Sequence, residues 1–279
     1  MRMKKKKIKA ILQGIVIALI CAVDVYPLLW MVSASFKQQS EWTSKPAYAL
    51  NEGFHFQNYI DAWTRGHMAT FFMNSLLCTL IALVFIVLFA CTVGFATTKM
   101  QWKGREFVSK FFSLGIMVPV ATALIPLFQI FNQLNLLNTR FCLIITYIAF
   151  GLSLSIYLVQ GYLRSLPDEL LEASVIDGCG IYRMMWLVVT PLMKNAIVTV
   201  LVLQFFFKWN DLLFSMTFIS DSALKTVQTG LLYFQDEFGS KNWGAIFASV
   251  SMSVLPMLVL YTILNKKVME GMTAGAVKG

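Results

Sequence analysis

Residues Lys208-Trp209-Asn210-Asp211 combine the types of side chain that proteins use to bind sugars. An indole ring can lie against the C–H face of a sugar, and a carboxamide or carboxylate can take its hydroxyl groups. This stretch falls inside an apolar run, where it predicts either the wall of a pathway or a packing contact between helices. Lys208 and Asp24 are two of the charges well inside such runs. No chain of acids accompanies them, so a structural charge is favoured over a proton or ion relay, although intramembrane charges are functional candidates by default.

A second group of charges, Glu169, Glu172 and Asp177, lies in a polar stretch between two apolar runs. Acids clustered at a membrane face could hold a metal ion in a membrane enzyme, but their helical context fits docking better. The sequence contains no G-x-x-x-x-G-K-[ST] phosphate loop, so this chain is not expected to hydrolyse ATP itself. His55 and His67 lack ligand-like spacing. We therefore expect no catalytic and no metal site.

The element that carries these acids is the stretch 163–195. Ser165, followed three residues later by Asp168, predicts a helix start, and Asp177-Gly178 predicts its end. A second short helix is expected from near Gly180 to Pro191. A helix of roughly 11 residues is about 16 Å long, whereas a membrane span needs about 30 Å. The stretch is therefore expected to lie along the membrane surface.

Spacing within this stretch matches a known signature. The chain has Glu172-Ala173-Ser174, then Gly178 after three residues, then Val188-Val189-Thr190-Pro191 after nine. This resembles the Glu-Ala-Ala, Gly, Ile-x-Leu-Pro signature of the integral-membrane permease subunits of bacterial ABC carbohydrate importers. Three positions depart from it, at Ser174, Val188 and Thr190.

Further matches extend the resemblance over nearly the whole chain. Asn74-Ser75-Leu76, Trp209-Asn210-Asp211 and the ending 271–279 look like the smaller, second maltose-permease-like subunit of that family. The resemblance implies that the loop is a coupling helix seated on a separate ATPase. The residues it assigns to ATPase coupling are Glu172, Ala173, Ser174, Asp177, Gly178, Gly180 and Pro191.

The resemblance also implies partners. These are a second homologous permease, two ATPase subunits that bind ATP, an extracellular sugar-binding protein and a carbohydrate, for which an oligosaccharide is expected. The outer connection 221–243, with Gln235 and Gly239 as candidate contacts, either reaches the binding protein or is a solvated loop. Asn74, Ser75, Trp209, Asn210 and Asp211 are candidates for the pathway or the subunit interface. Which sugar is carried, whether this chain touches it and whether the ATPase is shared stay open.

Composition independently predicts an all-α polytopic membrane protein. Hydrophobic residues make up 58% of the chain and charged residues 13%, against about 25% charged in an ordinary soluble domain. Apolar runs of spanning length lie at about 11–33, 71–97, 107–131, 141–163, 196–220 and 244–265. Residues 1–70 are expected to form a basic N-terminus, a first span and an outer loop, and residues 71–279 a five-helix core that contains the loop 163–195.

The net charge of +9 is sorted by side of the membrane, which argues against a nucleic-acid ligand. Sixteen Lys and Arg residues fall in the N-terminus, the second-to-third and fourth-to-fifth connections and the C-terminal tail, against six in the other connections. The positive-inside rule then places both termini and the loop 163–195 in the cytoplasm of a bacterial cell. Two rival functions remain: an ion-driven secondary transporter, which would need an ion relay and inverted repeats, and a polytopic membrane enzyme.

Overall fold

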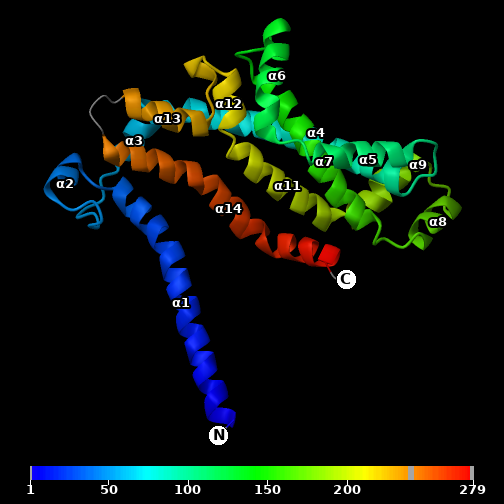
Figure 1. The fold of residues 1–279 in the computed structure, drawn as a ribbon, viewed down its shortest axis with the longest axis horizontal. Helices are drawn as coiled ribbons and strands as arrows, with labels where there is room; N and C mark the ends of the chain where they lie inside the picture. The colour runs from blue at the N-terminus through cyan, green and yellow to red at the C-terminus, as the bar shows by residue number, and fades with distance from the viewer. Residues whose placement is uncertain (1, 238–241, 277–279) are drawn as a thin grey trace. The chain divides into compact units, whose positions relative to one another are not determined.

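The computed structural model describes residues 2–237 and 242–276, and every regular element in that part of the chain is a helix, which confirms the all-α prediction. Figure 1 shows the order of its elements. The longest helices are α1 (Arg2–Ser35), α4 (Met68–Thr98), α7 (Arg140–Leu163) and α14 (Trp243–Ala276). Each contains an apolar segment long enough to cross a membrane. These four correspond to the first, second, fourth and sixth predicted spans.

The third predicted span, 107–131, is interrupted. Helix α5 (Arg105–Gly115) and helix α6 (Val120–Gln133) are bent by 101° at a short break. Pro119 is the last residue before α6, and proline both lacks a backbone donor and disfavours helical backbone in the residue before it. Taken together, α5 and α6 have the length and composition of one broken span.

The fifth predicted span, 196–220, is also divided. Helix α11 (Lys194–Trp209) has 16 residues, about 24 Å at 1.5 Å per residue. The chain then leaves the helix at 210–212 and resumes as α12 (Leu213–Phe218). The segment Ile181–Leu192 before α11 is bent from it by 76°, and this bent pair is the second that qualifies as a broken span. Counting each bent pair as one span gives up to six by length and composition, the predicted number. The second pair, however, begins inside the predicted surface loop 163–195 and ends at Trp209, so it does not coincide with the predicted span 196–220.

Backbone contacts divide the chain into two compact units, Met1–Met68 with Leu231–Val254, and Ala69–Gly230 with Leu255–Gly279. In the second unit, α5 and α11 pack on α7. Its core contains Ile86 from α4 and Tyr147, Ile156 and Leu163 from α7, all at most 1% exposed. Phe218 of α12 meets the ring of Phe131 edge-on at 5.1 Å, so the short helix after the break is held by the core.

The first unit folds the connection after α1 into a small capped structure with α2 (Gln39–Ser44) and α3 (Gln57–Thr64). The Trp42 ring stacks on Phe247 at 5.3 Å, and Lys37 Nζ lies 4.7 Å from the centre of the Trp42 ring. Burial lowers the pKa of Lys37. Burial alone would raise the pKa of Glu41, but backbone N–H groups of Gln38 and Glu52 donate to its carboxylate and the net pKa is lowered.

Candidate functional site: the 163–195 loop and the cavity at the break after α11

Helix α8 (Glu169–Ile176) is the first half of the 163–195 loop, and it starts later than predicted. Ser165 does not cap it, so the predicted start at Ser165 is wrong. The Ser165 hydroxyl instead donates to Tyr162 O at 2.7 Å, at the end of α7. Pro167 separates the two helices and α8 begins two residues later. The predicted end at Asp177-Gly178 is confirmed, since Asp177 follows the last residue of α8.

The turn after α8 depends on Gly178. Its φ is +76°, a left-handed backbone conformation that glycine adopts without steric cost. Gly180 has an ordinary φ of −68° and precedes α9 (Ile181–Arg183). A π-helical stretch, η1 (Met184–Val189), and α10 (Thr190–Leu192) complete the second half. The predicted helix from Gly180 to Pro191 is therefore present, with π-helical geometry in its middle.

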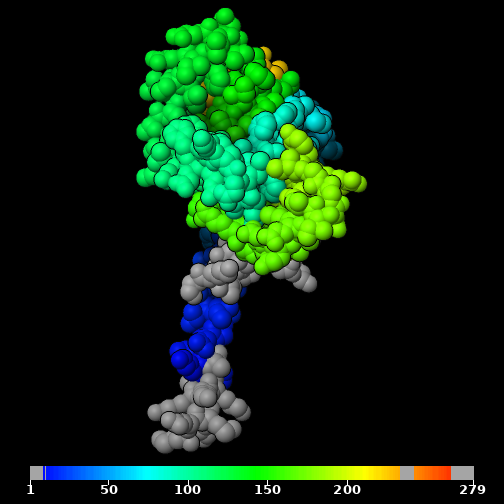
Figure 2. Space-filling view, turned by 90° about the vertical axis from the view of Figure 1, so that its right-hand side faces the viewer, coloured from blue at the N-terminus to red at the C-terminus, as the bar shows by residue number. Residues whose placement is uncertain are grey.

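Most residues assigned to ATPase coupling lie at the surface of the second unit. Glu172, Ala173, Asp177, Gly178, Gly180 and Pro191 are exposed, whereas Ser174 is buried and donates to Leu170 O at 2.8 Å. Next to them stand apolar side chains that face outward: Ile176 is 85% exposed and Tyr182 80%. Figure 2 shows this loop, in yellow-green, at the face turned toward the viewer. The arrangement is a projecting surface with acidic and apolar groups, suited to binding a protein.

Lys99, beyond the end of α4, holds the start of α8 in place. Its Nζ donates to Leu166 O at 2.7 Å and to Asp168 Oδ1 at 2.6 Å. The Lys99 side chain is 7% exposed, whereas that of Asp168 is 75% exposed. A cavity of about 430 Å³ lies beside this contact, lined by Lys99, Glu172 and Val175 among others. The loop is thus attached to α4 through a buried ammonium group.

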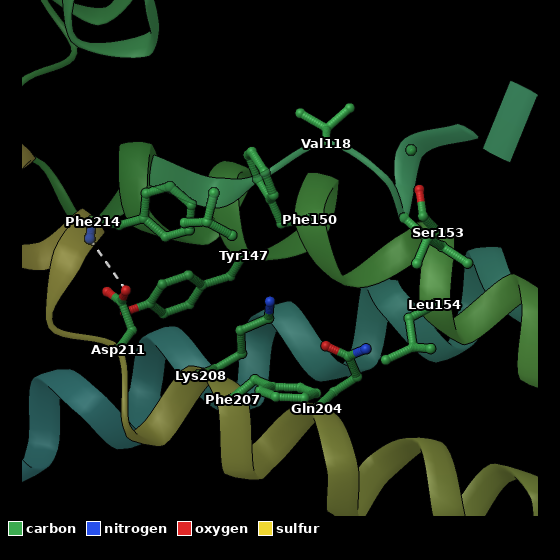
Figure 3. A pocket seen from close by; sticks show the side chains of 13 residues that line it. Val118, Tyr147, Phe150, Ser153, Leu154, Gln204, Phe207, Lys208, Asp211 and Phe214 are labelled. Atoms are coloured by element: carbon green, nitrogen blue, oxygen red, sulfur yellow. Dashed lines mark hydrogen bonds between the residues drawn. The ribbon is translucent and has the colours of Figure 1, made fainter. Parts of the chain in front are cut away.

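A second cavity, of about 340 Å³, lies at the break after α11. Figure 3 shows Lys208 and Gln204 from α11, Tyr147 and Ser153 from α7, and Asp211 around it. Trp209 does not line it. Its indole is 1% exposed, stacks on Phe205 at 5.5 Å and meets Phe72 edge-on at 5.1 Å. The geometry favours packing over sugar contact for Trp209.

Asp211 stabilises the break itself. Its carboxylate accepts hydrogen bonds from Tyr147 Oη at 2.9 Å, Phe214 N at 3.2 Å and Ser215 N at 3.0 Å. The two backbone amides belong to the first turn of α12, so Asp211 satisfies donors that a helix start leaves without partners. Asn210 is exposed, and its side chain donates to Phe206 O at 2.9 Å.

Asn74 and Ser75 join α4 to the segment that precedes α13 (Val227–Glu237). Asn74 Nδ2 donates to Ala223 O at 2.9 Å and Lys225 O at 3.0 Å, and its Oδ1 accepts from Arg140 Nε at 2.9 Å. Ser75 Oγ accepts from Val227 N at 2.9 Å. Both residues are buried. They connect α4 to neighbouring segments inside the protein.

The first part of the 221–243 connection is accordingly packed inward. Lys225, Thr226 and Val227 are at most 5% exposed, and a Cβ on Gly230 would overlap the Phe71 ring. A fully solvated loop is therefore wrong for this part. Gln235 lies in α13. Gly239 lies outside the described residues, as does part of the ending 271–279.

Sequence reasoning missed Lys99, Gln204, Tyr147 and Arg140. Each acts through a partner at least 53 residues away, as between Gln204 Nε2 and Gly151 O. Such pairs leave no local pattern. The only available signal was that a glutamine and a lysine stand one turn apart in an apolar run.

Comparison with known proteins bears on both sites. The family model described as "Binding-protein-dependent transport system inner membrane component" matches residues 86–270. The chain is 31% identical to a probable ABC transporter permease protein of Bacillus subtilis, over 91% of this chain and 84% of that protein. It is 29% identical to a diacetylchitobiose uptake system permease protein of Streptomyces coelicolor (90% and 83% covered), and 27% identical to a melibiose/raffinose/stachyose import permease protein of B. subtilis (94% and 94%).

Among solved structures, a bacterial ABC transporter involved in the import of the acidic polysaccharide alginate has a similar chain. The TM-score is 0.83 at 21% identity, covering 94% of this chain and 97% of that one. At this identity the likeness concerns the fold.

Proposed function

The chain belongs to the family of binding-protein-dependent transport system inner membrane components, and on that premise we propose that it forms half of the membrane pathway of an ABC importer for a carbohydrate. The other half would be a second, homologous permease. The family is one of transport permeases, so we propose that this chain moves its cargo without breaking a bond in it.

Support for a carbohydrate cargo comes from relatives and from the cavity after α11. Relatives are named for diacetylchitobiose, for melibiose, raffinose and stachyose, and for trehalose and maltose. The cavity is mainly apolar and aromatic with a few polar groups, which is the usual make-up of a small-molecule site. An oligosaccharide is the proposed cargo class.

The observation that carries the proposed coupling is the exposed surface of α8 and the turn after it. A helix of eight residues is too short to span a membrane and still presents exposed apolar side chains such as Val175 and Ile176. Exposed apolar groups of this kind commonly mark a protein interface. We propose that a separate ATPase subunit, which binds ATP, covers this surface and moves it when the two ATPase copies close.

Orientation follows from charge. Because Lys and Arg gather in the connections on the side of the 163–195 loop, we propose that this loop and both termini are cytoplasmic. An extracellular sugar-binding protein would then dock on the opposite side, near the 221–243 connection. ATP-driven closure would shift the importer between two states that the partners bind differently.

Co-purification tests the proposal. The tagged wild-type chain should bring down an ATPase and should support uptake of a labelled oligosaccharide. Glu172→Lys places a cation on the docking surface and should reduce ATPase recovery, because mismatched charge at an interface can cost several kcal/mol. Glu106→Lys on α5, where the Glu106 side chain is 78% exposed, is the matched control and should leave recovery unchanged.

Equal ATPase recovery with Glu172→Lys and Glu106→Lys would contradict the assignment of α8 to coupling. Sugar uptake by the wild-type chain without any ATPase would favour an ion-driven transporter instead.

A further inference from the structure

Two buried polar groups line the cavity after α11 without having their hydrogen-bonding capacity filled. Gln204 is 2% exposed, and its Oε1 has no hydrogen-bond partner within the described part of the chain. The amide cannot simply be turned around, because its Nε2 donates to Gly151 O at 3.1 Å. A buried acceptor left without a donor is unfavourable, because it has lost its hydrogen bonds to water.

Lys208 is a buried donor that lacks an acceptor in the part of the chain that the structure describes. The residue is 8% exposed, and its Nζ lies 5.7 Å from the centre of the Tyr147 ring. Among the described residues, no hydrogen bond to this ammonium is found. Asp211 is the nearest candidate counter-charge in sequence, but its carboxylate already accepts from Tyr147 and from two amides of α12.

An acceptor without a donor and a donor without an acceptor, side by side, can both be satisfied by one kind of ligand group. In Figure 3 the Lys208 ammonium and the Gln204 amide face the same cavity. A hydroxyl group both donates and accepts, so neighbouring hydroxyls could accept from Lys208 and donate to Gln204 Oε1. A carboxylate or phosphate would satisfy Lys208 alone and would place a second acceptor beside Gln204. Aromatic walls at Tyr147, Phe150 and Phe214 suit the C–H face of a sugar ring.

We propose that this cavity is a sugar subsite in the transport pathway, which binds adjacent hydroxyl groups of the cargo between Lys208 and Gln204. The proposal rests on the proposed carbohydrate import and adds the residues and the chemical group that this chain recognises. At about 340 Å³ the cavity falls at the small end of ligand sites, which begin near about 300 Å³, so it takes one sugar unit of a longer cargo.

Substitution separates a ligand role from a structural one. The whole importer would be expressed with both permeases, the ATPase and the binding protein, and uptake of labelled maltose, melibiose and diacetylchitobiose would be measured. Lys208→Met keeps an unbranched side chain of similar length and removes only the buried ammonium, so uptake is compared in complexes that are first shown to assemble in wild-type amounts. Its uptake should nevertheless fall at least about tenfold, since a lost hydrogen bond to a charged group is worth about 1.5–3 kcal/mol. Gln204→Met should also reduce uptake.

Lys110→Met is the matched control. The Lys110 side chain is 79% exposed on α5, and this variant should keep wild-type uptake. Wild-type uptake by assembled Lys208→Met and Gln204→Met complexes would overturn the subsite and leave carbohydrate import intact. Absence of uptake of all three sugars by the wild-type importer would overturn the proposed cargo, and the subsite with it.

A second measurement does not depend on the stability of those variants. Leu154 lines the same cavity. A Leu154→Cys chain with its five native cysteines replaced keeps Lys208 and Gln204 in place. The transported sugar should slow alkylation of this cysteine by a small thiol reagent in the assembled importer. An alkylation rate that the sugar leaves unchanged, in an importer that still takes up the sugar, would contradict the proposal.

Discussion

At the turn after α8, the backbone of Gly178 decides which residue fits. An added Cβ would meet nothing within 4 Å, so space is available there, yet φ is +76°. For a residue with a side chain this left-handed conformation costs about 1–2 kcal/mol. Gly180 has equally open space and a φ of −68°, so the two glycines differ in backbone and not in crowding.

We therefore expect Gly178→Ala to lower sugar uptake several-fold and Gly180→Ala to leave it near the wild-type rate. Gly178→Asn should retain more uptake than Gly178→Ala, because asparagine tolerates the left-handed region better. Gly178→Asp, which adds a charge at the proposed docking surface, should reduce uptake most. Uptake assays on membranes with matched amounts of inserted protein give the ranking. Equal uptake for Gly178→Ala and Gly180→Ala would show that the turn geometry does not matter for coupling.

At the scale of elements, α8 is positioned by a contact from α4. Lys99→Met removes both hydrogen bonds of its ammonium and leaves Leu166 O without this donor. We expect α8 to loosen, so that ATP hydrolysis per sugar transported rises and the 163–195 loop is cut faster by protease. Asp168→Asn should have a smaller effect, because Lys99 still reaches Leu166 O and an exposed ion pair is worth about 0–1 kcal/mol.

Lys103→Met is the control, since Lys103 is exposed in the same connection. A protease cleavage rate in Lys99→Met no faster than in Lys103→Met would remove the positioning role of Lys99.

Asn74 makes a second contact between elements, since it hydrogen-bonds α4 to α7 and to the segment before α13. Asn74→Leu would lose three hydrogen bonds, one of them buried and two partly buried. Because the freed carbonyls and Arg140 would also lose their partner, we expect a loss of about 2–4 kcal/mol. Ser75→Ala loses a single bond and should cost about 1 kcal/mol. Thermal unfolding of the purified complex measures both, and a smaller loss for Asn74→Leu than for Ser75→Ala would contradict this assignment.

Sequence patterns predicted where most helices lie, but they did not predict where the third and fifth spans are broken. The chain has prolines at 27, 126 and 256 inside helices, and Pro119 at a break. None of these four prolines has a backbone N–H group, so the residue type alone does not say which of them ends a helix. The outcome depends on packing from distant segments. The same holds for Trp209, which packs against Phe72 of α4. Local sequence left its role open between a pathway wall and a packing contact.

At the scale of the whole molecule, the predicted membrane orientation can be tested at two exposed tyrosines. Tyr48, 73% exposed, lies in the connection after α1, and Tyr182, 80% exposed, lies in α9. With Cys21, Cys78, Cys91, Cys142 and Cys179 replaced, Tyr48→Cys should react with an impermeant thiol reagent in intact cells. Tyr182→Cys should react only after the membrane is opened. The reverse pattern would invert the topology.

The broken fifth span has one more consequence, for how well the resting importer blocks ions. A helix that starts within a bilayer, as α12 does after the break, normally leaves backbone N–H groups without partners, and these would attract water. Here the Asp211 carboxylate accepts from the amides of Phe214 and Ser215, so these two groups need no water molecules. We therefore expect no continuous chain of water molecules at the break. Without such a chain, protons should not leak across the membrane there. Asp211→Ala would free these amides, and vesicles with this variant should lose a pH gradient faster than wild-type vesicles do.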